Sequence, residues 1–367
     1  MQVPFTLLWT VCLCISNAVG VFHQHHPKPI IIDTDIFSDV DDVGALAVAN
    51  VLHHCGYASL EAVMINTGSK YGALAANAIN TYYGNGDVPI GAIRPLTNQT
   101  FLDTYYFKLG EYASKVAHNF PRTLKRAEET EPPVSRYRSI LASAANASTT
   151  IISIGFLSNL AELLESEADD LSTMSGFDLI GAKFKELVVM GGAYPSGWEY
   201  NFGGHDPQSA ATVLSKWPSD VPITFSGAEL GESIFSGQDL ASRAPRDSPV
   251  LAAYRWYGDR CNTTSRSYDP LTVLYGIMGL GVEDTLYPHY FVYGNKDGYN
   301  TINGDDGTNA WVDDRSVTNQ HWLKLKDPLS RESLGEDLTR LYAWSPEQGE
   351  CCFGGVCGDD GGWRVQG

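Results

Sequence analysis

The chain has 367 residues, of which 43% are hydrophobic, enough for one large or two smaller α/β domains with a sizeable core. It carries 43 acidic and 25 basic residues, giving a formal net charge of −18. No dense cluster of lysine and arginine is present, which argues against nucleic acid as a partner, because phosphate backbones are bound largely by basic side chains.

The chain begins with an uncharged apolar segment. Its apolar core runs from Phe5 to Ile15, and the small residues Ala18 and Gly20 follow, as signal-peptidase cleavage requires. The run is too short to span a bilayer comfortably. We therefore interpret residues 1–20 as a secretory signal and predict a secreted protein with no membrane partner; a membrane anchor is the alternative.

Sequons and cysteines bear on the same prediction. The N-glycosylation pattern, asparagine with Ser or Thr two residues later, occurs at three positions, Asn98, Asn146 and Asn262. The cysteines beyond the signal are Cys55, Cys261, Cys351, Cys352 and Cys357. An odd number permits at most two disulfides. A CxxC zinc pattern is absent, so disulfides are the expected use of the cysteines in the Gly-rich tail, residues 346–367.

Short apolar runs alternate with helical patterns through the first two thirds of the chain. "PIIID" (29–33) precedes a helix with Val43, Leu46, Ala47 and Val51 at helical spacing. The later runs, each followed by a helical region, are "LEAVMIN" (60–66), "TTIISIG" (149–155), "KELVVMGG" (185–192) and "VPITFSG" (221–227). This alternation predicts an α/β fold with an open, mostly parallel sheet and helices on both faces. Ligands bind such sheets beyond the carboxyl ends of the strands.

Two regions depart from that pattern. Residues 121–138, rich in Arg, Glu and Pro, are expected to form an exposed excursion. From Tyr290 to Lys326, aromatic and β-branched residues mix with Asn-Gly and Asp-Gly pairs, which predicts C-terminal β-hairpins appended to the sheet. We place a single catalytic domain at residues 28–345.

Five aspartates crowd the end of the first strand in "DTDIFSDVDD". They are Asp33, Asp35, Asp39, Asp41 and Asp42. Helix capping by Asp39, with two more carboxylates favoured by the helix dipole, accounts for some of them. It does not account for all five, whereas a hard cation held by oxygen ligands turns their mutual repulsion into attraction. The cluster therefore predicts a metal site.

An apolar strand followed by DxD also opens the haloacid-dehalogenase phosphatases. Those usually carry Thr or Val two residues after the second aspartate, where this chain has Phe37. They also need a downstream lysine and a further acidic pair, which the sequence does not supply convincingly. This phosphatase reading remains an alternative.

The cluster and the blocks after it resemble the calcium-dependent nucleoside hydrolase family. "IIIDTDIFSDVDDVGALA" matches the family's opening strand, DxD, loop and DD, with a loop two residues longer than in the best-known members, which resembles the long-loop DTDxxxDxDD branch of the family. "IISIGFLSNLAELL", "ELVVMGGAY" with "EYNFGGHDPQSAA", and "SYDPLTVLY" match the later blocks in order, from Ile30 to about Tyr275. The resemblance implies the nucleoside hydrolase fold with its Rossmann-like core, and hydrolysis of ribonucleosides to base and ribose. Family members commonly form homo-oligomers, so a homo-oligomer is left open.

Carried over residue by residue, the resemblance also implies a site. Ca²⁺ would be held by Asp35, Asp42, Asp269 and the backbone carbonyl of Ile154. Asp35 would be the catalytic general base toward a water at the ion. The residues implied to bind substrate are Asp41 at the ribose hydroxyls, Glu199 and Asn201 at the 3′ and 5′ hydroxyls, and Asn66 by a less certain alignment.

The leaving base is the part of the site where the chain departs from some relatives. Those relatives have a histidine before the last aspartate as the acid that protonates the base, whereas this chain has Tyr268, whose pKa near ~10 makes it a poor donor. Tyr268 is expected to contact the base by stacking, with core packing as the alternative. Trp198 is a second candidate for base contact, and His205 a further candidate acid. A relative that binds nucleosides without cleaving them also stays in view.

Asp33 and Asp39 are expected to support the loop, the second as a helix cap or an outer support for the site, and Asp206 to start a helix.

Overall fold

The computed structural model describes residues 26–37, 39–100, 111–258, 260, 262–281 and 289–348. The expected signal, residues 1–20, and most of the Gly-rich tail lie outside this range. Among the residues within it, no helix combines the length and apolar character needed to cross a bilayer.

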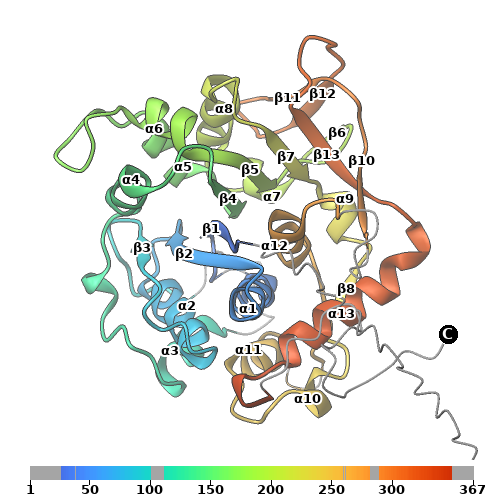
Figure 1. The fold of residues 1–367 in the computed structure, drawn as a ribbon. Helices are drawn as coiled ribbons and strands as arrows, with labels where there is room; N and C mark the ends of the chain where they lie inside the picture. Colours follow the sequence, from blue (N-terminus) through green and yellow to red (C-terminus); the bar gives the residue numbers. More distant parts are fainter. Residues whose placement is uncertain are drawn as a thin grey trace, which may run out of the picture.

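An eight-stranded sheet forms the centre of the molecule (Figure 1). Its strands are β1 (Lys28–Thr34), β2 (Ala58–Ile65), β3 (Ile90–Ala92), β4 (Thr149–Ile154), β5 (Phe184–Met190), β7 (Ile223–Ser226), β10 (Phe291–Tyr293) and β13 (Gln320–Leu325). The order is β10-β13-β7-β5-β4-β1-β2-β3, and only β10 runs antiparallel to its neighbour. The predicted open, mostly parallel sheet is confirmed.

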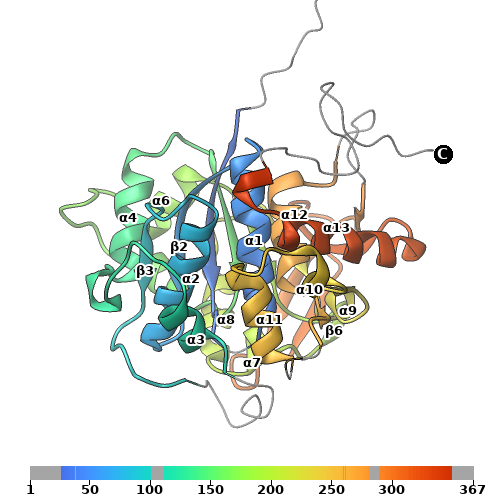
Figure 2. The ribbon, with the colours of Figure 1, turned by 90° about the horizontal axis from the view of Figure 1, so that it is seen from below.

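Helices cover both faces of the sheet (Figures 1 and 2). One face carries α1 (Asp41–His54), α2 (Lys70–Tyr82), α3 (Ala113–Asn119), α11 (Pro249–Tyr257), α12 (Asp269–Met278) and α13 (Arg331–Ala343). The other carries α4 (Pro133–Ser143), α5 (Ser158–Leu164), α6 (Gly176–Lys183) and α8 (Pro207–Lys216). Short helical pieces are α7 (Tyr200–Gly203), α9 (Ala228–Gly231), α10 (Leu240–Arg243), η2 (Ala127–Glu129), η3 (Pro328–Ser330) and η4 (Pro346–Gln348).

The isoleucines of β1 show why this strand is apolar throughout. Ile30 and Ile32 pack into the core on the α1 side, and Ile31 packs into the core on the α4 side. Successive side chains of a strand point to opposite faces. A strand covered on both faces therefore has no position for a polar residue until its carboxyl end.

The strands after residue 290 form the expected hairpin and also extend the main sheet. β11 (Tyr299–Ile302) and β12 (Asn309–Val312) form an antiparallel hairpin, and β12 also pairs with β6 (Ser196–Gly197). β10 and β13 instead lengthen the main sheet. A further two-stranded ribbon joins β8 (Phe235–Ser236) and β9 (Ser265–Arg266).

The exposed excursion expected over residues 121–138 is only partly correct. The segment from Pro133 begins α4, whose Tyr137 and Arg138 are buried. The Arg138 guanidinium contacts both carboxylate oxygens of Asp169, at 2.8 and 2.9 Å, and donates to the carbonyls of Ser172 and Met174, each at 2.9 Å. An arginine can be buried when its donors are satisfied in this way.

Replacing Arg138 with alanine is expected to lower the free energy of unfolding by about 3 kcal/mol, because packing and several buried hydrogen bonds are lost. Urea denaturation measures this change. Arg126→Ala is the matched control, since its ion pair with Glu129 is largely exposed and contributes less than about 1 kcal/mol. Equal effects of the two substitutions would contradict the structural role of Arg138.

The strand order reverses between β1 and β4, which lie side by side and end together, Thr34 pairing with Ile154. β2 and β3 follow on one side of this point and β5 and β7 on the other. Such a switch point opens a crevice at the carboxyl ends of the strands, where ligands of open α/β sheets bind.

Candidate functional site

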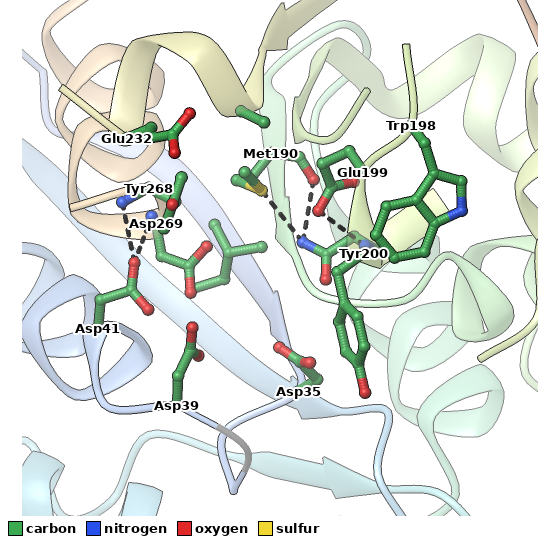
Figure 3. A pocket seen from close by; sticks show the side chains of 13 residues that line it. Asp35, Asp39, Asp41, Met190, Trp198, Glu199, Tyr200, Glu232, Tyr268 and Asp269 are labelled. Carbon is green, nitrogen blue, oxygen red and sulfur yellow. Dashed lines mark hydrogen bonds between the residues drawn. The ribbon is translucent and has the colours of Figure 1, made fainter. Parts of the chain in front are cut away.

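A pocket of about 270 Å³ opens at this switch point (Figure 3). Its lining includes eight residues predicted from the sequence: Asp35, Asp41, Ile154, Trp198, Glu199, Asn201, Tyr268 and Asp269. The remaining lining residues are Asp39, Met190, Tyr200, Ala228 and Glu232. The pocket is of a size for a small molecule, not for a polymer.

Four aspartates form one group where α1 and α12 begin, and Figure 3 shows the three of them that line the pocket, Asp39, Asp41 and Asp269. Each of Asp39, Asp41, Asp42 and Asp269 offers a carboxylate oxygen, and these oxygens all lie within 4.8 Å of one another. Asp41 and Asp42 open α1, and Asp269 opens α12. We call these four residues the carboxylate group.

Asp41 ties the two helix ends together. Its Oδ2 accepts hydrogen bonds from the backbone N–H groups of Tyr268, at 2.9 Å, and Asp269, at 3.1 Å. The start of α12 is thereby fixed against the start of α1. The free N–H groups of a helix N-terminus favour nearby carboxylates, which helps this group to assemble.

The carboxylate group is strongly unfavourable without a cation. Burial raises the pKa of Asp39, Asp42 and Asp269 well above the usual range, and the neighbouring carboxylates raise each pKa further. Asp42 is fully buried; its Oδ1 accepts from the Thr34 hydroxyl, while its Oδ2 has no hydrogen-bond partner. A buried oxygen with no partner is costly. A hard cation among the four residues supplies the partner, so the residues present fit a metal ion.

Asp35 and Ile154 come from the adjacent ends of β1 and β4. Both line the pocket, but Asp35 is not part of the carboxylate group. Gly155 follows Ile154 at the point of closest approach, because a Cβ there would lie 2.4 Å from the Asp35 nitrogen. Only glycine lets the two strand ends come this close. The assignment of Asp35 and the Ile154 carbonyl as metal ligands stays a prediction.

Asp33 supports the site from below and does not line the pocket. Tyr137 donates to its Oδ2 at 2.7 Å, Asn66 donates to its Oδ1 at 2.7 Å, and Asn159 lies within 3.2 Å of both oxygens. Burial nevertheless raises the pKa of Asp33 to about 7. These bonds tie β1 to the elements on either side of it, in agreement with the expected supporting role.

Asn66 directly follows β2, at the edge of the sheet where the pocket opens. Its amide nitrogen donates to Asp33 and, at 2.9 Å, to the carbonyl of Phe156, and Asn66 is not among the residues that line the pocket. Its buried Oδ1 has no hydrogen-bond partner, and its assignment as a substrate-binding residue stays a prediction.

Glu199 lies across the pocket from Asp41 (Figure 3), and Asn201 lines the same pocket. Glu199 caps α7: its Oε1 accepts from Asn201 N at 2.7 Å, and its Oε2 accepts from the N–H groups of Phe202 and Gly192, each at 3.2 Å. The Asn201 side chain donates to the Met190 carbonyl at 3.2 Å. Burial raises the pKa of Glu199 to about 7, although hydrogen bonds from four backbone N–H groups oppose the rise.

The raised pKa of Glu199 predicts a pH-dependent stability. Because the folded state binds the proton more tightly than the unfolded state, the contribution of Glu199 falls as pH rises from about 4.5 to about 7. Glu199→Gln removes this dependence, so its stability relative to wild type should increase over that window by on the order of 3 kcal/mol. Urea denaturation in a calcium chelator at pH 4.5 and pH 8 measures it. A difference between the two proteins that does not change with pH would refute the prediction.

Aromatic side chains form the remaining walls of the pocket. Tyr268 is half-buried and packs against Gly231. Trp198 is 50% exposed, and its indole N–H donates to the carbonyl of Asp306 in the β11–β12 turn at 2.9 Å. Tyr200 contacts Trp198 edge-on, at 6.4 Å between ring centroids. These rings give the pocket apolar surface in addition to its carboxylates.

The structure bears on three neighbouring polar residues, Asp39, His205 and Asp206. Asp39 does not cap α1, because the N-cap position is Val40 and no side-chain cap bond is made. His205 is exposed, packs on the Phe156 ring and does not line the pocket. Asp206 does start α8, accepting from Ser209 N at 3.2 Å.

The pocket also contains residues that sequence reasoning missed. Tyr200 lies between Glu199 and Asn201, so the third block carried a signal for it. Glu232 follows α9, and its carboxylate forms an ion pair with Arg266 at 3.6 Å, but nothing in the local sequence marks it. Met190 ends β5 and is found only from its place at the sheet edge.

Comparison with known proteins bears on the family and the fold. The family model described as "Inosine-uridine preferring nucleoside hydrolase" matches residues 30–321. No curated protein matches the chain. Similar solved structures include a plant nucleoside hydrolase (TM-score 0.58), an inosine-guanosine nucleoside hydrolase (0.62) and a purine-preferring ribonucleoside hydrolase from Gardnerella vaginalis (0.60). Each is 17% identical and covers 86% of this chain and 98% of its own. At this identity the likeness establishes the fold.

Proposed function

Since the chain belongs to the inosine-uridine preferring nucleoside hydrolase family, and is thus a hydrolase acting on N-glycosyl compounds, we propose that it cleaves ribonucleosides with Ca²⁺ as cofactor and Asp35 as general base. The observation that carries the proposal is the unpartnered, buried Asp42 oxygen in a carboxylate group beside a nucleoside-sized pocket. The phosphatase alternative is not favoured, because the family match spans residues 30–321.

Calcium would be held by Asp42 and Asp269, with Asp35 and the Ile154 carbonyl as further ligands. When bound, the ion would orient the 2′ and 3′ ribose hydroxyls and a water, and lower the pKa of that water. A site made only of oxygen ligands suits calcium better than a soft transition metal. The buried, unpartnered oxygen of Asp42 supports this assignment on the side of the protein.

The remaining proposed roles, proton transfer and ribose binding, belong to protein side chains. Asp35 accepts the proton of the attacking water. Asp41, whose Oδ2 is held by two backbone N–H groups, presents its Oδ1 to the ribose hydroxyls. Glu199 and Asn201 hold the 3′ and 5′ hydroxyls. Cleavage builds positive charge on the ribose, and the surrounding carboxylates favour that charge.

The leaving base would contact the aromatic walls. Tyr268 directly precedes Asp269 and lines the pocket, which supports stacking of the base on its ring. Trp198, which directly follows β6, lines the pocket and is exposed enough to contact a ligand. No histidine, lysine or arginine is among the described residues that line the pocket. Among these residues, the pocket provides aromatic surface for the leaving nucleobase, but no histidine, lysine or arginine that could protonate it.

A nucleoside panel tests the proposal. The purified protein is incubated with inosine, adenosine, guanosine, uridine and cytidine, and reducing ribose is measured with and without a calcium chelator. Release that stops with chelator and returns with calcium is the expected result. Release that chelation does not affect would contradict the metal role. Binding of a nucleoside by calorimetry without release would identify a silent relative, and turnover of a phosphomonoester alone would restore the phosphatase reading.

Secretion is part of the same proposal. Cys55 is disulfide-bonded, which is typical of proteins that mature in an oxidising compartment. The asparagines of all three sequons are exposed and therefore accessible to glycosylation. The expected product is a glycoprotein in the culture medium that lacks residues 1–20. N-terminal sequencing and deglycosylation of material from a eukaryotic host test this, and retention of the intact chain in the cell would contradict it.

A further inference from the structure

The loop between β1 and α1 brings one more carboxylate to the metal site than the family resemblance implied. Asp39 belongs to the carboxylate group and lines the pocket. Figure 3 shows its side chain directed toward Asp41 and Asp269. The resemblance gave Asp39 no contact with the ion, and it does not cap α1.

The loop is held in a way that fixes this orientation. The buried hydroxyl of Tyr112 accepts from the Phe37 backbone N–H at 3.0 Å and donates to the Asp39 carbonyl. Phe37 and Val40, on either side of Asp39, are buried in the core. Phe37 has a φ of 149°, a conformation that a bulky residue keeps only where its surroundings impose it. Burial of the two apolar neighbours leaves Asp39 on the pocket side.

In the described part of the chain, the side-chain partner recorded for the Asp39 carboxylate is another carboxylate, that of Asp41. None of the ion pairs found there involves it, and its nearest charged neighbours are the other aspartates of the site. The unpartnered Asp42 oxygen in the same group independently indicates a bound cation. A carboxylate that repels its neighbours and has no cationic side chain is stabilised by that cation.

We infer that Asp39 is an additional ligand of the ion held by Asp42 and Asp269, and that the longer loop thereby strengthens Ca²⁺ binding. This inference rests on the metal site of the proposed function. Calcium affinity rises with the number of charged ligands. The loop, held by the two hydrogen bonds of Tyr112, thus affects how tightly the protein binds Ca²⁺.

Calcium titration by calorimetry of metal-free protein tests the inference. Asp39→Ala is expected to weaken Ca²⁺ binding by roughly tenfold or more, and Asp39→Asn, which keeps one oxygen, by less. Asp220→Asn is the control, because Asp220 is exposed and outside the pocket lining. Unchanged affinity in Asp39→Ala would overturn the inference while leaving the proposed metal site intact. Failure of the wild-type protein to bind calcium would overturn both.

Thermal unfolding separates a ligand from a merely structural residue. Without metal, Asp39→Asn is expected to melt higher than wild type, because one repelling charge is gone. With saturating calcium, its gain in melting temperature should be smaller than that of wild type. A lower melting temperature both with and without calcium, with an unchanged calcium-induced gain, would assign Asp39 a structural role and refute the inference.

Discussion

Replacing Asp42 with alanine is expected to abolish calcium binding and to lower kcat/KM for a cleaved nucleoside by roughly a thousandfold or more. Asp42 is fully buried, and its Oδ2 is the atom of the carboxylate group that has no partner in the protein. Alanine removes both oxygens and leaves the other three carboxylates without the innermost ligand. Asparagine is a weaker test, since its side chain could turn its oxygen toward the ion.

Calorimetry with calcium and reducing-ribose assays with inosine measure the two effects in parallel. Asp220→Asn again serves as the control for a lost surface charge. Circular dichroism and a cooperative melt in chelator establish that the variant is folded, because Asp42→Ala also loses the hydrogen bond from Thr34. Normal calcium affinity in a folded Asp42→Ala protein would show that the ion is held by other residues.

The sequence predicted the sheet well because its signal is local. In β1, a run of isoleucines followed by aspartates indicates a strand that is covered on both faces and ends at a polar edge of the sheet. The helices after the strands follow from spacing alone. Residues 121–138 were misjudged because composition there indicates the surface. The burial of Arg138 depends on acceptors 28 to 36 residues further along the chain, which no local pattern reveals.

The site was predicted in its residues but less well in their roles. Five aspartates within ten residues indicated a cation, yet which of them would face it depended on the path of the loop. That path is set by Tyr112, 73 residues from Asp39, so local spacing could not separate a cap from a ligand. The hydrogen bond from the Asn66 amide nitrogen to Asp33, on the neighbouring strand, is likewise a contact that no local pattern reveals.

Asp35 and Asp42 occupy different positions in the site. Asp42 belongs to the buried carboxylate group, whereas Asp35 lines the pocket next to that group, at the end of β1. The close packing of Gly155 against the Asp35 backbone fixes its position relative to β4. In the proposed function, a carboxylate in this position would receive the proton of a water held between the ion and the open pocket.

Asp35→Asn is accordingly expected to lower kcat by roughly a thousandfold while calcium affinity changes less than about tenfold. Asparagine keeps a side-chain oxygen that a hard cation accepts, but it takes up no proton at neutral pH. Single-turnover release of ribose gives the rate, and calorimetry gives the dissociation constants of calcium and of a nucleoside at saturating calcium. If calcium affinity and turnover fall together, as in Asp42→Ala, Asp35 acts chiefly as a ligand. If turnover persists with the ion bound, the general base is another residue, and Asp39, across the pocket floor from Asp35, is the carboxylate to test next.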